Sequence, residues 1–313
     1  MDGEKPESEV SVVIVNHNTR DFLRRCLASI DPNCETIVVD NDSSDGSAEM
    51  VETEFPEVKL VRNTFNAGFG PANNQGIDLA QRPLVLLLNS DACALEGSIG
   101  KLASVFRNRD VVAAGGRLLF PSGFLQNSCA NELSLWAVFC EQTYLEKVFP
   151  NSRVFSPYWT TRLYADIETP VEVKQVMGAC LMFRPVERFD ERFFLYCEDT
   201  ELCKRLSRHG KILYVPTARF IHDLGSSTPT RWQAIARYNA GKELYFLLHH
   251  GRLAAVLCWL LNRFGALVRL IAWTLAMAAT LGLSKRFAQK ALCFLKVLTS
   301  PIDGPERPSR KPR

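Results

Sequence analysis

The sequence predicts an α/β protein with a mainly parallel sheet flanked by helices, followed by an apolar and basic helical extension at the C-terminal end. Short β-branched runs alternate with helical stretches of about ten residues, a pattern typical of parallel sheets. Polar residues follow the ends of several of these runs. The chain of 313 residues accommodates one domain of roughly 200–250 residues and an appendage. The expected parts are a polar tail (1–9), the α/β domain (10–230), the helical region (231–300) and a basic, disordered tail (301–313).

Each element follows from local composition. The first strand is Val10–Asn16, a β-branched run of buried-strand length. The other expected strands are 35–40, 58–62, 84–89, 111–114 and 212–215, with ordered structure at 173–183. The expected helices are 21–30, 43–55, 70–80, 97–107 and 199–209, the last ended by Gly210. Residues 120–170 hold scattered aromatics and prolines and are expected to wrap the sheet or to shape a cleft.

The net charge of +3 conceals a division of charge along the chain. From Arg231 to the end there are fourteen Lys and Arg against three acids, so the preceding part carries a net charge of about −8. The basic residues are spaced through apolar segments, which favours an anionic membrane surface over nucleic acid as their partner. The ten cysteines show no CxxC pair, which indicates a reducing compartment, and the polar start MDGEKPESEV does not resemble a signal peptide.

Residues 253–283 are apolar but are interrupted by Arg263 and Arg269. The longest uninterrupted run, 270–283, is about 14 residues long, whereas a spanning helix needs about 20. An in-plane helix or hairpin whose arginines reach the headgroups fits this pattern. A spanning or re-entrant segment, and burial in a dimer or domain contact, are the alternatives.

Two segments have the character of a nucleotide site. Asp40 ends a buried strand, and the carboxyl ends of parallel strands are where ligands bind, so its carboxylate can accept hydrogen bonds from a base or a ribose. The segment RNTFNAGFGPANNQG places Gly68 and Gly70 before a helix that opens with Asn73, so a ligand can approach the backbone closely. It is neither a GxGxxG nor a Walker loop, which disfavours a dinucleotide or ATP. The alternative for the Asp40 segment is an ordinary turn, and the alternative for residues 62–76 is a flexible loop and helix start.

Three further motifs carry candidate chemistry. Asn89, Ser90 and Asp91 follow a fully apolar strand, where a carboxylate can hold Mg²⁺ or Mn²⁺ against a diphosphate; the alternative is a turn. Glu198 and Asp199 lie between an aromatic run and a helix, where partial burial would favour a general base; the alternative is a helix cap. His222 follows a strand and is either part of this site or structural.

Taken together, these segments resemble family-2 glycosyltransferases with the GT-A fold, a Rossmann-like sheet, and in particular the rhamnosyltransferase-like branch. The matching segments are VVIVNHNT, VVDNDSSDGS, NAGFGPANNQG, LLLNSDA, VMGACLMFRP, FDERFFLYCEDTELCKRL and IHDLGSST. They extend over residues 10–227, most of the chain. Each motif alone is weak, but together in this order they are specific.

The resemblance implies roles for residues in each segment. Asp199 would be the catalytic base, with Glu198 its neighbour. Asp91 would bind Mg²⁺ or Mn²⁺, with Asn89 at the first position of the family's Asp-x-Asp motif and His222 as a further metal or diphosphate contact. Gly178 and Ala179 would line the acceptor side of the donor sugar. The residues expected to contact the donor nucleotide or its sugar are Asn16, Asp40, Asn66, Gly68, Asn73, Ser90, Gly178 and Ala179.

The implied activity is a metal-dependent, inverting transfer of a sugar from a nucleoside-diphosphate donor to an acceptor hydroxyl. The resemblance favours rhamnose as the sugar, carried by thymidine diphosphate, and a lipid-linked glycan as the acceptor. The implied location is cytoplasmic, peripheral or monotopic on the inner face of the cell membrane. The alternatives are a polyprenyl-phosphate sugar synthase, a sugar nucleotidyltransferase, and an inactive membrane-bound scaffold of the same fold.

Overall fold

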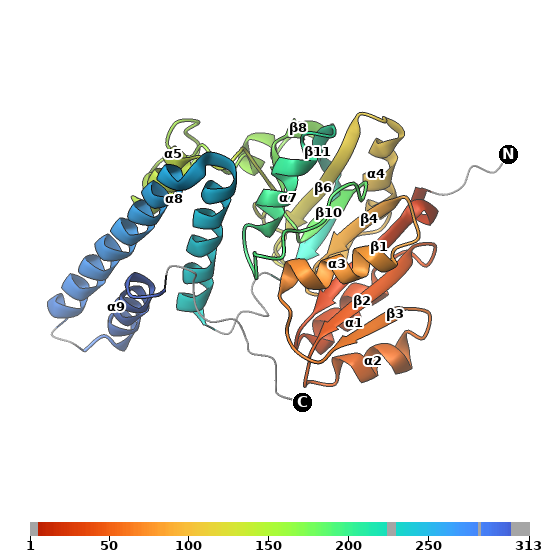
Figure 1. Ribbon diagram of the computed structural model, residues 1–313, viewed down its shortest axis with the longest axis horizontal. Coiled ribbons are helices and arrows are strands. Elements are labelled where there is room, and N and C mark those ends of the chain that lie inside the picture. Colours follow the sequence, from red (N-terminus) through yellow and green to blue (C-terminus); the bar gives the residue numbers. More distant parts are fainter. Residues whose placement is uncertain (1–5, 224–229, 281–282, 302–313) are drawn as a thin grey trace.

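The computed structural model describes residues 6–223, 230–280 and 283–301 (Figure 1). A large sheet forms the centre of the domain. Its strands are β1 (Val10–Asn16), β2 (Glu35–Asn41), β3 (Lys59–Asn63), β4 (Leu84–Leu88), β5 (Ala92–Ala94), β6 (Val111–Leu119), β8 (Val171–Val173), β10 (Cys180–Phe183) and β11 (Lys211–His222). They lie in the order β3-β2-β1-β4-β10-β6-β11-β5, and β8 pairs with β11. The short strands β7 (Cys129–Ala130) and β9 (Gln175–Val176) form a separate pair.

Strand direction divides the sheet. The first four strands in the order pair in parallel, as the alternation of strands and helices predicts. β10 then runs antiparallel to both β4 and β6, and β11 is parallel to β6 but antiparallel to β5 and β8. The reversal at β10 brings the start of that strand to the same edge as the ends of β1 and β4, because Cys180 lies opposite Leu88.

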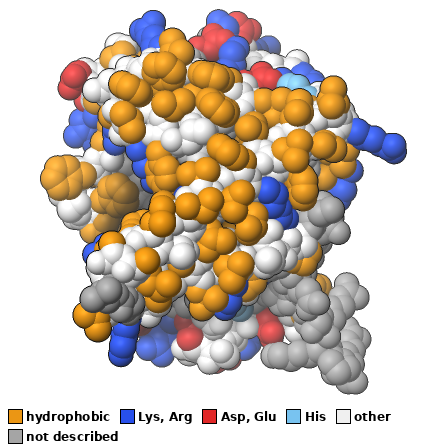
Figure 2. Space-filling view, turned by 90° about the vertical axis from the view of Figure 1, so that its left-hand side faces the viewer, with side chains coloured by type: hydrophobic (Ala, Val, Ile, Leu, Met, Phe, Trp, Pro, Cys, Tyr) orange, Lys and Arg blue, Asp and Glu red, His pale blue; other side chains and the backbone are white. Residues whose placement is uncertain are grey.

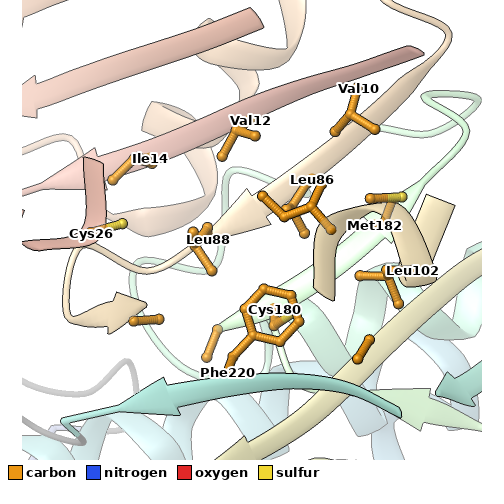
Figure 3. Close-up of a cluster of buried hydrophobic side chains, with 14 of the residues drawn as sticks. Val10, Val12, Ile14, Cys26, Leu86, Leu88, Leu102, Cys180, Met182 and Phe220 are labelled. Atoms are coloured by element: carbon orange, nitrogen blue, oxygen red, sulfur yellow. The ribbon is translucent and has the colours of Figure 1, made fainter. Parts of the chain in front are cut away.

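Helices cover both faces of the sheet. The helices before the extension are α1 (Arg20–Ala28), α2 (Ser47–Glu54), α3 (Phe69–Leu79), α4 (Ser98–Ser104), α5 (Leu135–Gln142), α6 (Leu145–Val148) and α7 (Glu198–Leu206). Three short 3-10 segments are η1 (Pro6–Glu9), η2 (Val105–Arg107) and η3 (Thr161–Tyr164). Side chains alternate along each strand, so one face packs on α1, α2 and α4, and the other packs on α3 and α7. Figure 3 shows the first of these cores, where Val12 and Leu86 meet Met182 and Leu102.

Strands β6 and β11 extend well beyond the residues expected from hydrophobic runs alone. The second half of β6 contains Gly115, Gly116 and the buried Arg117. A Cβ at Gly116 would lie 2.5 Å from the Phe220 ring, so glycine allows β11 to pack there. Because β11 is longer than expected, it ends at His222, which lies opposite Ala92 of β5.

Residues 120–170 pack against both the sheet domain and the C-terminal extension. They hold α5 and α6, and α5 contacts the long helix α8 (Arg231–Ala279). A third apolar cluster joins Val138 of this segment with Tyr245 and Phe246 of α8. The segment therefore connects the sheet domain with the C-terminal extension through its contacts with both.

The extension consists of α8 and α9 (Lys285–Leu298). Gly251, with φ 84°, interrupts the helical geometry of α8, and the helix bends there into two arms with α9 packed against it (Figure 1). The second arm exposes apolar side chains, among them Leu253 and Leu275, which are 74% and 65% exposed (Figure 2). One window of α8 reaches a mean hydropathy of 1.6, which is apolar enough to cross a membrane by composition. The expected disordered tail after residue 301 lies outside the described residues.

Candidate active site

The ends of β1 and β2 are joined by a buried amide. Asn16 Nδ2 donates to Asp40 Oδ2 at 2.9 Å and to Ser43 Oγ at 3.0 Å. The other oxygen, Asp40 Oδ1, accepts from the Ser43 backbone N–H at 2.9 Å. Both Asn16 and Asp40 are nearly inaccessible to solvent. Asp40 is therefore a fixed carboxylate at the strand ends, held by two hydrogen-bond donors, Asn16 Nδ2 and the Ser43 backbone N–H.

Thr19 connects this group to the loop after β4. Its hydroxyl lies 2.6 Å from Asn16 Oδ1 and 2.8 Å from Ser90 Oγ. Ser90 and Asp91 are both 7% exposed. Asn16, Asp40 and Ser90, which were predicted to contact the nucleotide-sugar donor, therefore belong to one hydrogen-bonded group. Asp91 is the next residue along the chain.

Asp91 and His222 face each other because β11 pairs with β5, which places His222 opposite Ala92. His222 Nε2 lies 3.2 Å from Asp91 Oδ1. His222 Nδ1 lies 2.6 Å from Gln126 Oε1, while Gln126 Nε2 donates to the His222 carbonyl at 3.3 Å. Because the amide oxygen can only accept, Nδ1 carries a hydrogen, and Nε2 faces the Asp91 carboxylate. A cation between Nε2 and the carboxylate oxygen, either a proton or a metal ion, would join them.

Asn89 supplies a further oxygen beside this pair. Its Nδ2 lies 3.3 Å from His222 Nε2, and its Oδ1 is buried without a hydrogen-bond donor among the described residues. A buried acceptor of this kind costs about 1–3 kcal/mol unless a ligand satisfies it. No group of three or more His, Cys, Asp or Glu side chains in the described ranges could hold a metal ion by itself. Asn89, Asp91 and His222 therefore fit a cation that takes its remaining ligands from a bound phosphate group, as Mg²⁺ often does.

The acidic pair, Glu198 and Asp199, lies close to the start of β10. Asn89 N donates to the Ala179 carbonyl at 3.2 Å, and Gly178 N donates to Asp199 Oδ2 at 2.9 Å. A Cβ at Gly178 would lie 3.2 Å from Asp199 Cβ. Gly178 and Ala179 thus connect the Asp91 loop with Asp199, and the acids at 40, 91 and 199 are joined by a continuous path of contacts.

The two acids differ in their hydrogen bonds. α7 begins at Glu198, and its N-cap residue, Cys197, makes no side-chain capping bond. Asp199 accepts from Gly178 N and from Thr200 N at 2.7 Å, whereas Glu198 Oε2 is buried with no donor among the described residues. Burial, together with the charge of Asp199, raises the pKa of Glu198 to about 8. Burial also raises the pKa of Asp199, opposed by its backbone hydrogen bonds. Glu198 is therefore largely protonated near neutral pH, whereas the backbone hydrogen bonds to Asp199 favour its charged form.

The segment before α3 packs against Phe194, in the loop that leads to the acidic pair. Gly68 has φ 94°, and a Cβ there would lie 2.6 Å from the Phe194 carbonyl, so only glycine fits. Asn41 Nδ2 donates to the Gly68 carbonyl at 3.0 Å, and Asn66 Oδ1 accepts from Gly68 N at 2.9 Å. Asn73 donates to the Phe69 carbonyl within α3, so its amide group is engaged in the helix start.

Several residues of the site carried no signal in the sequence. Thr19, Ser43 and Gln126 bind predicted residues, yet hydroxyl and amide side chains are common in any loop. Arg237 of α8 lies over the Phe194 ring at 4.9 Å, and its Nε is buried without an acceptor among the described residues. These residues are brought to the site by chain folding alone.

Comparison with known proteins identifies related chains. Residues 11–167 match the model of glycosyl transferase family 2. The N-acetylglucosaminyl-diphospho-decaprenol L-rhamnosyltransferase of Mycobacterium tuberculosis is 30% identical over 241 residues, 69% of this chain and 76% of that protein. The low-salt glycan biosynthesis hexosyltransferase Agl10 of Haloferax volcanii is 23% identical, over 64% of this chain and 62% of its own.

A solved structure shows the same architecture. The mannosyltransferase PcManGT from Pyrobaculum calidifontis, in complex with GDP-Man and Mn²⁺, superposes with a TM-score of 0.54. It is 14% identical, and the match covers 93% of this chain and 85% of that one. The expected GT-A fold and the rhamnosyltransferase-like character are confirmed by these comparisons.

Proposed function

The chain belongs to glycosyl transferase family 2, and from this premise we propose that it is an inverting, metal-dependent enzyme that transfers a sugar to a lipid-linked glycan. The donor is a nucleoside-diphosphate sugar, and the favoured sugar is rhamnose carried by thymidine diphosphate. The observation that carries the proposal is the arrangement of one carboxyl group fixed by backbone N–H groups, that of Asp199, across Gly178 and Ala179 from the Asn89–Asp91–His222 group.

Asp199 has the environment of a general base. Its two oxygens are fixed by the backbone N–H groups of Gly178 and Thr200, so the carboxylate is oriented before an acceptor arrives. Burial raises the pKa of Asp199, as suits a general base, and the backbone hydrogen bonds oppose this shift by favouring the ionised form. In the proposed reaction, Asp199 takes the proton of the acceptor hydroxyl as that oxygen attacks the anomeric carbon. The bond to the diphosphate breaks in the same step, so the anomeric configuration inverts.

Glu198 assists by remaining neutral. A second carboxylate beside Asp199 would repel it and the diphosphate leaving group. The buried, protonated Glu198 instead leaves one negative charge at the acceptor side of the site. Glu198 is thus a positioning residue, and Asp199 is the catalytic one.

The nucleoside diphosphate, which is the leaving group, would lie at the end of the site opposite Asp199. Asp91, Asn89 and His222 would hold a Mg²⁺ or Mn²⁺ ion, which when bound neutralises the charge that develops on the diphosphate. Gln126 orients His222 by accepting from Nδ1, as the outer partners of metal-binding histidines commonly do. The relative PcManGT was solved with Mn²⁺, which supports the same class of cofactor here.

The nucleotide would occupy the edge formed by β1 and β2. Asp40, fixed by Asn16, can accept from a base or ribose, and Ser90 continues this polar surface toward Asp91. The segment from Asn66 to Gly68 offers backbone that a ligand can approach closely because Gly68 has no side chain. Asn73, held inside α3, would shape this segment rather than contact the ligand strongly.

The acceptor proposal rests on the relative and on the extension. The mycobacterial relative acts on a decaprenol-linked substrate. The second arm of α8 exposes Leu253, Val256 and Leu260 together, a surface suited to the membrane that holds such lipids. We place the enzyme on the cytoplasmic face of the membrane, attached through α8 and α9, with an anionic surface matching its basic residues.

A donor and acceptor screen tests the proposal. Purified protein is incubated with thymidine-, uridine- and guanosine-diphosphate sugars, with Mn²⁺ or with a chelator, and with a lipid-linked N-acetylglucosamine or a bare polyprenyl phosphate. We expect transfer to the lipid-linked sugar only with the metal, with inverted configuration in the product. Transfer to bare polyprenyl phosphate would instead identify a polyprenyl-phosphate sugar synthase. Failure to bind any donor would identify a scaffold.

A further inference from the structure

A cavity of about 410 Å³ lies between the first turn of α8, the second arm of α8, and α9. This volume is within the range of small-molecule sites, roughly 300–1,000 Å³. Its polar lining includes four cationic side chains, Arg231, Arg286, Lys290 and Lys296. Trp232 and Trp273 form aromatic walls. None of these residues belongs to the site at the strand ends.

The four cations have no anionic partner in the described part of the chain. No ion pair is formed by any of them there, and the sequence from Leu244 to Ser300 holds no Asp or Glu. Burial, and then the charges of Arg286 and Arg231, lower the pKa of Lys290. Like charges gathered in a hollow without a counter-ion raise the energy of the folded protein, and an anion in the hollow would remove that cost.

The tryptophan rings contact two of these cations. Lys290 Nζ lies 3.8 Å from the centroid of the Trp273 ring, and Lys296 Nζ lies 5.7 Å from that of Trp232. Such contacts are worth about 0.5–1 kcal/mol at exposed sites, less than charge-assisted hydrogen bonds to an anion. A phosphate, with several strong acceptor oxygens, can therefore draw Lys290 away from Trp273.

The surroundings of the cavity indicate what carries the anion. Leu292, which lines the cavity, is 51% exposed, and neighbouring Leu275 and Leu283 are 65% and 83% exposed. The same side of the molecule carries the apolar surface of α8 (Figure 2). Tryptophan and basic side chains beside exposed apolar side chains are typical of the headgroup level of a bilayer. A freely soluble phosphate would need the cations but not this apolar border.

We propose that the cavity between α8 and α9 binds the phosphate headgroup of a membrane lipid, with Arg286 and Lys290 as its principal ligands. The headgroup belongs either to an anionic phospholipid, which would anchor the enzyme, or to an isoprenoid diphosphate, which would hold an acceptor lipid beside it. Both sources share the chemistry of a phosphate joined to an apolar chain. The proposal does not depend on the donor chemistry at the strand ends.

Calorimetric titration of the full chain with soluble short-chain probes tests this site. The probes are dihexanoylphosphatidylglycerol, farnesyl diphosphate, inorganic phosphate and, as a zwitterionic control without net charge, dihexanoylphosphatidylcholine. We expect saturable binding of at least one lipid phosphate, weakened about tenfold or more in Arg286→Gln/Lys290→Gln, because each lost charged contact removes a strong hydrogen bond. Arg252→Gln removes an exposed cation of α8 outside the cavity and should leave the affinity unchanged.

The relative affinities of the probes distinguish the two lipid sources of the headgroup. Tighter binding of phosphatidylglycerol assigns an anchoring phospholipid, and tighter binding of farnesyl diphosphate assigns an isoprenoid acceptor. Equal affinity in the double variant and the wild type, equal binding of phosphatidylcholine, or binding of inorganic phosphate as tight as either lipid would overturn the proposal. Donor affinity measured on the same samples shows that the variants are folded, and the single variant Arg286→Gln serves if the double variant is not. Because no turnover is measured, failure here leaves the transferase proposal untouched.

Discussion

Glu198→Gln is expected to make the protein more stable at neutral and alkaline pH. The Glu198 side chain is 5% exposed, and its Oε2 has no donor among the described residues. Burial and the neighbouring Asp199 raise its pKa from 4.5 to about 8. A glutamine has the shape of the protonated acid but cannot ionise, so the variant keeps the packing and removes the titration.

The direction of the pH effect on the free energy of unfolding follows from proton binding. Between the two pKa values the folded protein holds a proton on Glu198 that the unfolded chain has released, so the free energy of unfolding falls as pH rises. The contribution is fully present below about pH 4.5 and is lost as pH rises toward about 8. At 1.36 kcal/mol per pH unit, the wild type should lose about 3–4 kcal/mol relative to Glu198→Gln between about pH 5 and pH 8.

Thermal unfolding measured across this pH range checks the magnitude. The two proteins should unfold at similar temperatures near pH 5, and the variant should unfold roughly 5 °C or more above the wild type near pH 8. Glu172→Gln, which removes an exposed carboxyl on β8, is the matched control and should follow the wild type. Parallel pH profiles for the wild type and Glu198→Gln would refute the assignment of a neutral, buried Glu198.

Three further changes test other parts of the structure. Gln126→Leu removes the acceptor for His222 Nδ1 and should lower Mn²⁺-dependent activity about 10–100-fold, with Mn²⁺ titration as the measurement. Gly178→Ala places a Cβ 3.2 Å from Asp199 Cβ, so the carboxylate must shift by a few tenths of an ångström; turnover should fall roughly tenfold with donor affinity retained. Deletion of the chain after Gly251 should release the protein from sedimented membranes, and equal sedimentation would contradict the membrane role of the extension.

The N-terminal half of the fold could be predicted closely because its strands are continuous apolar runs. Val10–Asn16 has the bounds expected from composition, since a β-branched run between polar residues has few alternatives. β6 is longer than the expected strand because Gly115 and Gly116 carry no hydrophobic signal, and β11 also continues beyond its apolar run. They continue as strands because neighbouring elements pack on them, a tertiary effect that local composition does not contain.

The candidate site was predicted unevenly for a similar reason. Acids and amides that follow apolar strands could be placed at one edge, since parallel strands end together. The antiparallel direction of β10, next to Gly178 and Asp199, was not predicted, because no local pattern encodes strand direction. The resemblance to a family pointed only to Gly178 and Ala179 themselves. Gln126 lies in a segment of irregular composition, so its contact with His222 could not be inferred from the sequence.

The extension shows what composition can and cannot decide. Its apolar and basic character predicted a membrane-associating helical region, and the structure has two helices there with an exposed apolar surface. The bend at Gly251 and the cavity beside Trp273 depend on how α9 packs against α8. Neither follows from hydropathy, because the same residues could form a straight helix.

The central claim is that Asp199 is the base of a single displacement, and the transfer rate of Asp199→Asn tests it most directly. The variant should bind the donor with unchanged affinity and lose about 10²–10⁴ in turnover, because an amide cannot accept the proton. Glu198→Gln, the matched change at the adjacent residue, should retain most of the transfer rate. Wild-type turnover in Asp199→Asn would contradict the mechanism.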